Sequence, residues 1–142
     1  LPACRELGVG FVPFSPLGRA ILTGTVGSES VFGKGDTRAR MPRFQDENFT
    51  HNLGIVEEFL MLARELACTP AQLALSWLLH QGEDIAPIPG TKRVRYLEEN
   101  AGAATLALDE AALARLGEIF STERIRGARY DARGLEMVDA DD

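Results

Sequence analysis

Two short apolar runs in this chain predict two buried β-strands. Residues 9–14 (VGFVPF) and 84–88 (DIAPI) are rich in apolar side chains and lack a regular polar alternation. Strands that are covered on both faces, as in parallel sheets, show this pattern. Pro13 limits the first run, because proline cannot donate to a ladder of backbone hydrogen bonds.

Two helical patterns precede the second run. Apolar residues at helical spacing predict a broad buried face on a helix that begins at Asn52, a residue type that often caps a helix. A second helix is predicted from Thr69, where Thr69 and Gln72 form a capping box and Pro70 occupies the first turn. Gly82 is expected to stop this helix.

Three further helices are predicted outside the two runs. Residues 1–8 are typical of a short helix that closes on Gly8. A stripe of Val94, Leu97, Ala101 and Ala104 predicts a helix after the second run. Asp109 then caps a last helix, whose inward-facing residues are Leu113, Leu116, Ile119 and Phe120.

The order of these elements predicts a right-handed crossover between two parallel strands. Two parallel strands alone cannot cover their own edges and are marginally stable. The sequence therefore predicts a piece of a larger sheet or barrel. The absence of a starting Met is also typical of sequence from the middle of a protein.

A long loop is predicted from residue 25 to residue 52. Its segment 33–44 is basic and is interrupted by glycine and proline. Loops of this length in compact domains are often lids or mobile connections. Its arginines either contact a phosphate or lie in solvent, and we favour solvent. We also expect residues 27–52 to become ordered over a bound cofactor.

Composition restricts the class of protein. The chain has 142 residues, 45% of them apolar, and a net charge of -6, which argues against a general nucleic-acid binder. No apolar run approaches the roughly 20 residues that span a bilayer, and no secretory signal precedes the first run. Cys4 and Cys68 have no metal-type spacing and are expected to be free thiols. We expect a cytoplasmic protein whose residues from 121 to 142 form a polar, frayed, acidic tail.

Two loops are candidate ligand sites. Residues 85–100, called here the 85–100 corner, combine an apolar run, Gly90, two basic residues and a helix start, an arrangement that suits a phosphate. Residues 15–24, called here the 15–24 loop, carry a hydroxyl, two glycines and an arginine. Basic residues near a helix start are also often solvated, so the residues alone leave both interpretations open.

No catalytic group is evident in the sequence. His51 and His80 have no acidic or nucleophilic partner at a meaningful spacing and are expected to be structural or exposed. Tyr96 and Tyr130 have no neighbour that marks them as proton donors, so we assign neither a catalytic role.

Seven motifs together resemble the aldo-keto reductase superfamily, in the branch with auxin-induced-type and bacterial members. They are FVPFSPLGR at residues 11–19, LTG at 22–24, PRF at 42–44, EN at 47–48, CTPAQLAL at 68–75, PIPGTKR at 87–93 and LEEN at 97–100. The resemblance runs through nearly the whole chain in the same order. It implies a (β/α)8 TIM barrel of the α/β class, of which residues 1–142 are a C-terminal segment with the last two strand units.

The resemblance also implies an NADP(H) site. In the family the first loop holds the pyrophosphate, the second meets the adenosine 2′-phosphate, and a Glu-Asn pair binds the adenine amino group. The corresponding cofactor-binding residues are Ser15, Leu17 and Gly18, then Gly90, Thr91, Lys92 and Arg93, then Glu98, Glu99 and Asn100.

One position departs from the family pattern. Many relatives have an arginine or glutamine where this chain has Tyr96, so the 2′-phosphate is left to Lys92, Arg93 or Arg95. A phosphate dianion needs such a cation when it is partly removed from water.

The family's catalytic tyrosine, lysine, aspartate and histidine have no counterpart in this chain. The resemblance thus implies a small-molecule carbonyl reductase when complete, and an inactive fragment alone. One alternative is a non-enzymatic nucleotide sensor of the potassium-channel β-subunit type, and a gene that lacks the upstream tyrosine and lysine would favour it. Another is an unrelated phosphate-binding α/β module.

Overall fold

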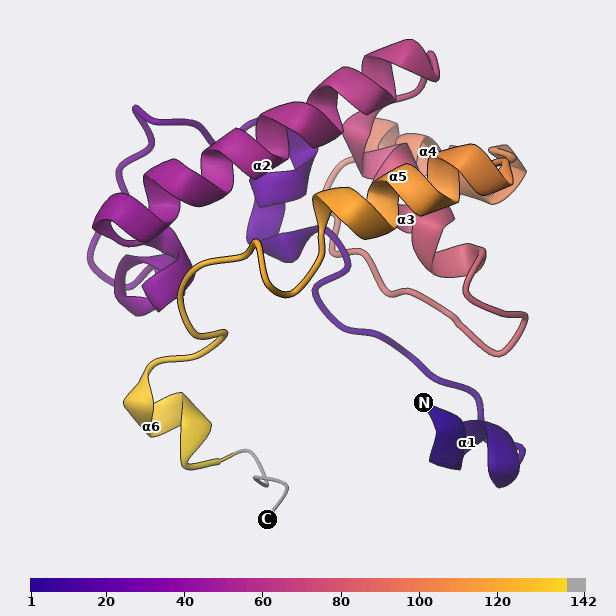
Figure 1. Ribbon diagram of the computed structural model, residues 1–142, viewed down its shortest axis with the longest axis horizontal. Coiled ribbons are helices and arrows are strands. Elements are labelled where there is room, and N and C mark those ends of the chain that lie inside the picture. Colours follow the sequence, from indigo (N-terminus) through magenta and orange to yellow (C-terminus); the bar gives the residue numbers. More distant parts are fainter. Residues whose placement is uncertain (138–142) are drawn as a thin grey trace.

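The computed structural model describes residues 1–137, and helices and loops account for this part of the chain. The α-helices are α1 (Pro2–Glu6), α2 (Asp46–Glu65), α3 (Pro70–Leu79), α4 (Val94–Gly102), α5 (Glu110–Ile119) and α6 (Ala132–Leu135). Short 3-10 helices are η1 (Gly18–Thr23), η2 (Thr37–Arg40), η3 (Pro42–Phe44) and η4 (Ala103–Thr105). In Figure 1, α2 to α5 gather together, whereas α1 and α6 stand apart from them.

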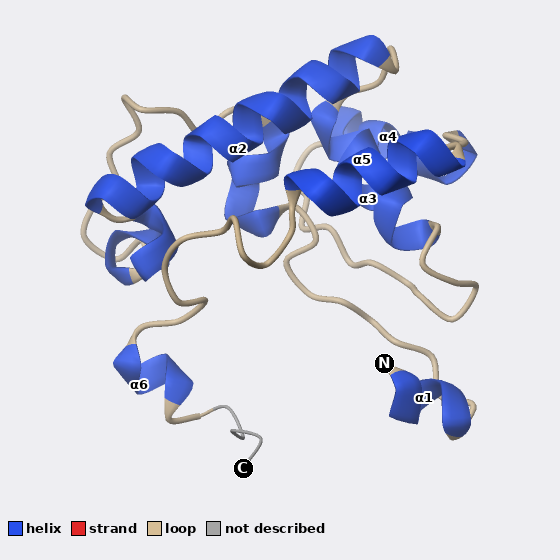
Figure 2. Ribbon diagram, in the orientation of Figure 1, coloured by secondary structure: helices blue, strands red, loops and turns tan. Residues whose placement is uncertain are grey.

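The two predicted apolar segments lie in parallel, but neither forms a strand in the described residues, as Figure 2 shows. Phe11 and Ile85 form an isolated parallel bridge. The amide of Phe11 donates to the Asp84 carbonyl at 2.7 Å, and the amide of Ala86 donates to the Phe11 carbonyl at 3.0 Å. The prediction of strands is therefore wrong, and the predicted parallel direction is confirmed.

Prolines and the lack of neighbours explain why the ladder stays short. Pro13, Pro87 and Pro89 interrupt both segments, and proline has no N–H to donate. The last contact is a long one, from the Ile88 amide to the Pro13 carbonyl at 3.5 Å. A pair of extended segments without a third partner is marginal in water.

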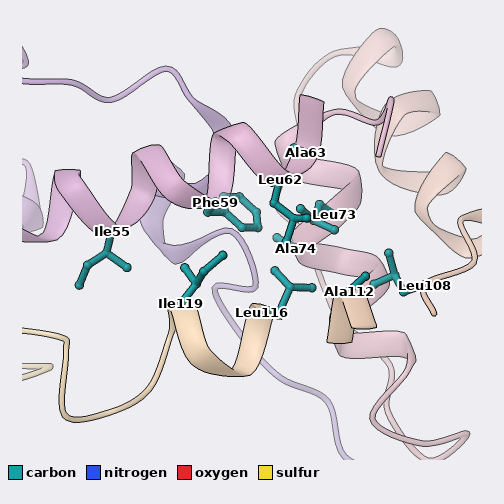
Figure 3. Packing of buried hydrophobic residues seen from close by; sticks show 10 residues of the cluster. All are labelled: Ile55, Phe59, Leu62, Ala63, Leu73, Ala74, Leu108, Ala112, Leu116 and Ile119. Atoms are coloured by element: carbon teal, nitrogen blue, oxygen red, sulfur yellow. The ribbon is translucent and has the colours of Figure 1, made fainter. Parts of the chain in front are cut away.

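The core is formed by α2, α3, α5 and the segment before α5 (Figure 3). Its buried side chains are Ile55, Phe59, Leu62, Ala63, Leu73, Ala74, Leu108, Ala112, Leu116 and Ile119. Leu17 and Leu22 of the 15–24 loop pack against this cluster, as does Trp77. Burial of apolar surface thus holds this loop against the helices.

Two predicted helix starts are confirmed by their caps. The Thr69 hydroxyl accepts a hydrogen bond from the Gln72 amide at 3.2 Å, and the Gln72 side chain accepts from the Thr69 amide at 3.1 Å. The Asp109 carboxylate accepts from the Ala112 amide at 2.8 Å at the start of α5. These pairs satisfy backbone donors that a helix start leaves free.

The predicted start of α2 is wrong. The helix begins at Asp46, with Asp46 and Glu47 placing negative charge in its first turn, where the helix dipole favours it. Asn52 is buried inside the helix. Its amide nitrogen donates to the Arg43 carbonyl at 3.1 Å and to the Arg126 carbonyl at 2.9 Å, and its oxygen accepts from the Arg126 amide at 2.9 Å.

The predicted apolar stripe of α4 is not buried. Val94 is 71% exposed and Leu97 is 57% exposed, and Ala101 and Ala104 are exposed as well. The helix instead approaches α3 at Gly102, where an added Cβ would lie 2.6 Å from the Gln72 side-chain nitrogen. The predicted stripe therefore lies in solvent in the described residues.

The segment after α5 is held against α2, so the predicted frayed tail is wrong for residues 124–127. Arg124 forms an ion pair with Glu58 of α2, and its carbonyl lies 2.8 Å from the His51 ring nitrogen. A side chain at Gly127 would meet the Pro42 carbonyl carbon at 2.8 Å. The last part of the predicted tail, residues 138–142, lies outside the described residues.

The position of Asn52 gives a stability prediction. Replacing Asn52 with Ala removes three part-buried hydrogen bonds to the backbone of Arg43 and Arg126, so the free energy of unfolding should fall by about 3 kcal/mol. Asn48→Ala is the matched control, since Asn48 donates one hydrogen bond, to the Pro42 carbonyl at 3.2 Å, and should lose about 1 kcal/mol. Urea unfolding followed by circular dichroism measures both, and equal losses would contradict the anchoring role of Asn52.

Candidate functional site

A cavity of about 500 Å³ lies between the 15–24 loop and the 85–100 corner. Its lining residues come from both, together with two neighbouring residues: Ser15, Pro16, Leu17, Arg19, Ala20, Thr23, Thr25, Ala71, Gly90, Tyr96, Glu99 and Asn100. Cavities of about 300–1,000 Å³ are typical of small-molecule sites. The lining combines apolar contacts with hydroxyl, guanidinium, carboxylate and amide groups.

The parallel pairing of the two apolar segments brings these loops together. The 15–24 loop follows the segment that contains Phe11, and Gly90 follows the segment that contains Ile85. Because the two segments run in the same direction, both chains leave at the same end. Ligands of α/β proteins bind at this end, beyond the carboxyl ends of parallel strands.

Left-handed backbone conformations shape the 15–24 loop. Ser15 has φ 52°, Arg19 has φ 57° and Ala20 has φ 74°, in addition to Gly18 at φ 57°. This region is unfavourable for residues with a Cβ, at a cost of about 1–3 kcal/mol each. Such strain concentrates at ligand sites, and here three strained residues line one cavity.

Arg38 of the long loop supports the backbone of Arg19. Its guanidinium donates to the Arg19 carbonyl at 3.2 Å and lies 4.5 Å from the centroid of the Phe32 ring. An ion pair with Asp36 at 2.6 Å fixes the guanidinium, lowering the pKa of Asp36 and raising the pKa of Arg38. The long loop therefore has a defined contact with the candidate site.

A second loop arginine, Arg43, is half-buried. Its Nε donates to the Gly127 carbonyl at 3.2 Å, and burial lowers its pKa, with smaller contributions from the charges of Arg129 and Arg19. The prediction that the loop arginines lie in solvent is thus wrong for Arg38 and Arg43. Arg43 is drawn inward by its contact with Gly127 in the segment after α5. Arg38 is held by its ion pair with Asp36 and by the Arg19 carbonyl.

The structure gathers half of the ten predicted site residues around the cavity. Ser15, Leu17, Gly90, Glu99 and Asn100 line it. Gly18 lines a neighbouring cavity of about 190 Å³. Thr91, Lys92 and Arg93 before α4, and Glu98 within it, are exposed and line neither cavity. Whether these ten residues bind a cofactor stays a prediction.

Several lining residues were not predicted. Arg19 and Thr23 stand inside the candidate 15–24 loop, whose cation, hydroxyls and glycines marked the loop as a whole, but they are not among the ten predicted binding residues. Tyr96 reaches the cavity from the first turn of α4. Thr25 and Ala71 have no such signal, because packing alone places them there.

The histidines have structural partners, as predicted. The Leu108 amide donates to Nε2 of His80 at 3.2 Å, so Nδ1 carries the proton and donates to the Ser76 carbonyl at 2.8 Å. Both cysteines are free thiols, and burial raises the pKa of Cys68. Within residues 1–137, no group of three or more potential ligands is placed to hold a metal, and no helix is long and apolar enough to cross a membrane.

Helices surround two parallel extended segments, and a cavity lies where both segments end, which is the place where α/β proteins bind their ligands. The sequence profile of the Aldo/keto reductase family matches residues 1–120, and the chain belongs to this family. The family resemblance of the seven motifs is thereby confirmed.

Similar proteins come from fungi and plants. The chain is 47% identical over 130 residues to the aldo-keto reductase yakc of Schizosaccharomyces pombe, named as an NADP(+) enzyme, covering 92% of this chain and 38% of that protein. It is 45% identical over 130 residues to a probable aldo-keto reductase of Glycine max, covering 92% and 37%. The chain thus spans about two fifths of the length of these relatives.

A solved structure shows the shared fold. The chain superposes on a glycerol dehydrogenase from Gluconobacter oxydans with a TM-score of 0.81 at 23% sequence identity, covering 90% of this chain and 39% of that one. The chain therefore folds like part of a TIM-barrel aldo-keto reductase, although the described residues contain no barrel strand.

The strained loop gives a second stability prediction. Ala20→Gly removes a Cβ from a residue at φ 74° and should raise the free energy of unfolding by about 1 kcal/mol. Ala114→Gly is the control, because Ala114 is exposed within α5 and glycine there should lower stability by about 1 kcal/mol. Urea unfolding compares the two variants. A lower free energy of unfolding in both would contradict the left-handed conformation of Ala20.

Proposed function

We propose that this chain is the cofactor-holding part of an NADP(H)-dependent oxidoreductase that reduces aldehydes and ketones to alcohols. The observation that carries the proposal is the single cavity to which two loops, far apart in sequence, contribute Ser15, Arg19, Gly90, Glu99 and Asn100. The Schizosaccharomyces pombe relative is named as an NADP(+) enzyme, and this supports NADP(H) as the cofactor.

The groups in the cavity fit the adenosine end of a dinucleotide. Glu99 and Asn100 offer the carboxylate and amide oxygens that an adenine amino group needs as acceptors. The Ser15 hydroxyl and the Arg19 guanidinium offer donors to a pyrophosphate, and a guanidinium is well suited to this because it binds phosphate oxygens bidentately. An anion beside Arg19 would also offset part of the repulsion between Arg19 and Arg43.

The exposed apolar side chains support an incomplete barrel. Val9, Val12, Phe14 and Ile88 of the two extended segments are each more than half exposed. Large apolar patches of this kind mark surfaces that are covered in the functional protein. We assign the two segments to the last two strand units of a (β/α)8 barrel, whose other strands would cover these residues.

In such a barrel this chain would bind and orient the cofactor, and it would provide no catalytic residue. The bound cofactor supplies hydride to a carbonyl carbon, and the proton must come from a group outside residues 1–142. The chain alone is then inactive.

Ordering of residues 27–52 over the cofactor, and a cytoplasmic location, stay predictions. Turnover of an aldehyde by the complete protein would separate this proposal from the sensor alternative.

Nucleotide binding tests the proposal directly. NADPH should bind and accept excitation energy from Trp77, the one tryptophan of the chain, which lines a cavity next to Ser15 and Pro16. Arg19→Ala should weaken binding at least about tenfold, the effect of losing one charge-assisted hydrogen bond.

Arg64→Ala is the matched control. Arg64 is exposed on α2 and contacts Glu57 at 3.6 Å, away from the cavity, so its removal should leave NADPH binding unchanged. Absence of NADPH binding to the chain, or equal affinity in Arg19→Ala and Arg64→Ala, would refute the proposal.

A further inference from the structure

The segment after α5 is fixed in place over α2 and the long loop. Asn52 of α2 holds the backbone of Arg126 through two hydrogen bonds of 2.9 Å. Arg43 of the long loop donates from its Nε to the Gly127 carbonyl at 3.2 Å. These long-range contacts determine where the residues that follow in this segment lie.

At the end of this segment, Arg129 and Tyr130 meet the 15–24 loop. The central carbon of the Arg19 guanidinium lies 5.6 Å from the centroid of the Tyr130 ring. That of Arg129 lies 5.3 Å from the centroid of Phe14, the last residue before the loop, and 5.7 Å from the centroid of Tyr130. Contacts of this length between a cation and an aromatic ring are attractive. Two guanidinium groups thus meet at the carboxyl end of the first extended segment, the end at which barrel enzymes have their active sites.

The charges at this place leave a surplus of positive charge. Asp36 and Asp131 are already paired with other arginines of the long loop, at 2.6 Å and 3.4 Å. Within residues 1–137, no ion pair includes Arg19, Arg43 or Arg129. Burial lowers the pKa of Arg43, and the charges of Arg129 and Arg19 lower it further. Cations grouped in this way attract an anion.

Arg129 stands apart from Glu99 and Asn100, the residues proposed to bind adenine. It lines the cavity of about 290 Å³ that also includes Trp77, whereas Glu99 and Asn100 line the larger cavity. Both cavities include Ser15. Except for Arg129, the side chains around the smaller cavity carry no charge, and most of them are apolar. A small ligand with an apolar body and one negative charge fits this combination.

We propose that Arg129 and Tyr130 bind a carboxylate of the substrate, so that the complete reductase prefers aldehydes and ketones that carry a carboxylate. The Arg129 guanidinium offers two parallel N–H donors, which match the two oxygens of a carboxylate, and the Tyr130 hydroxyl offers another. One guanidinium and a neutral phenol balance a single negative charge, which suits a carboxylate better than a phosphate dianion. This inference rests on the proposed function, because it names the substrate class of the same site and leaves Arg19 to the pyrophosphate.

A matched pair of aldehydes isolates the carboxylate. The compounds para-formylbenzoate and its methyl ester differ in that charge, and quenching of Trp77 fluorescence reports their binding, since Trp77 lines the same cavity as Arg129. The chain should bind the carboxylate about tenfold more tightly than the ester, the effect of one charge-assisted hydrogen bond. Arg129→Ala should abolish this preference by weakening the binding of the carboxylate alone. Arg129→Lys should keep part of it, because the charge remains and the fork of donors is lost.

Arg133→Ala is the matched control. Arg133 is an exposed arginine in the same part of the chain that lines a different cavity, so its removal changes the net charge equally and should keep the preference. NADPH should bind to Arg129→Ala as it binds to the unmutated chain. In the complete reductase, the two aldehydes should differ in kcat/KM in the same direction, through KM.

The outcomes separate this subsite from the proposed function. If NADPH binds but the two aldehydes bind equally, or Arg129→Ala keeps the preference as Arg133→Ala does, the carboxylate subsite is refuted and the proposed function stands. If Arg129→Ala weakens NADPH binding as much as Arg19→Ala does, Arg129 serves the cofactor and its substrate role is refuted. A chain that binds no NADPH refutes the proposed function and, with it, the substrate role of Arg129.

Discussion

The parallel contact between the segments of Phe11 and Ile85 determines the rest of the site. It consists of one bridge and a few backbone hydrogen bonds, yet it joins residues 74 positions apart in the sequence. Because the segments run in the same direction, the 15–24 loop and the 85–100 corner leave at one end and enclose one cavity. An antiparallel contact would place these loops at opposite ends, and no cavity would include both.

Local signals in the sequence predict the elements that local chemistry controls. The Thr69 capping box and the Asp109 cap are satisfied within three residues of themselves, so the sequence contains all that they need. The start of α2 was missed for the opposite reason. Asn52 is a good cap by residue type, but its amide is used by Arg43 and Arg126, and the second of these lies 74 residues further along the chain.

The sequence also predicts part of the candidate site. Ser15, Leu17, Gly90, Glu99 and Asn100 were identified by family motifs and meet around one cavity. Motifs do not give the direction of a side chain, which is why Lys92 was included and Arg19 was not. The burial of Arg38 and Arg43 depends on Asp36, Phe32 and Gly127, and composition rules place loop arginines in solvent.

The two loops around the cavity are anchored within the described residues. The apolar faces of the bridged segments between them are left exposed. The 15–24 loop is anchored by Leu17 and Leu22 on the helical core, and α4 is anchored on α3 beside Gly102, so neither anchor needs further strands. The apolar faces of the bridged segments do need them, because Val12, Phe14 and Ile88 face water. Additional strands would therefore lengthen the parallel ladder and hold the two loops at a fixed separation. Each loop of the cavity is held by contacts within this chain, whereas the spacing between the two loops depends on how many strands stand beside the bridge.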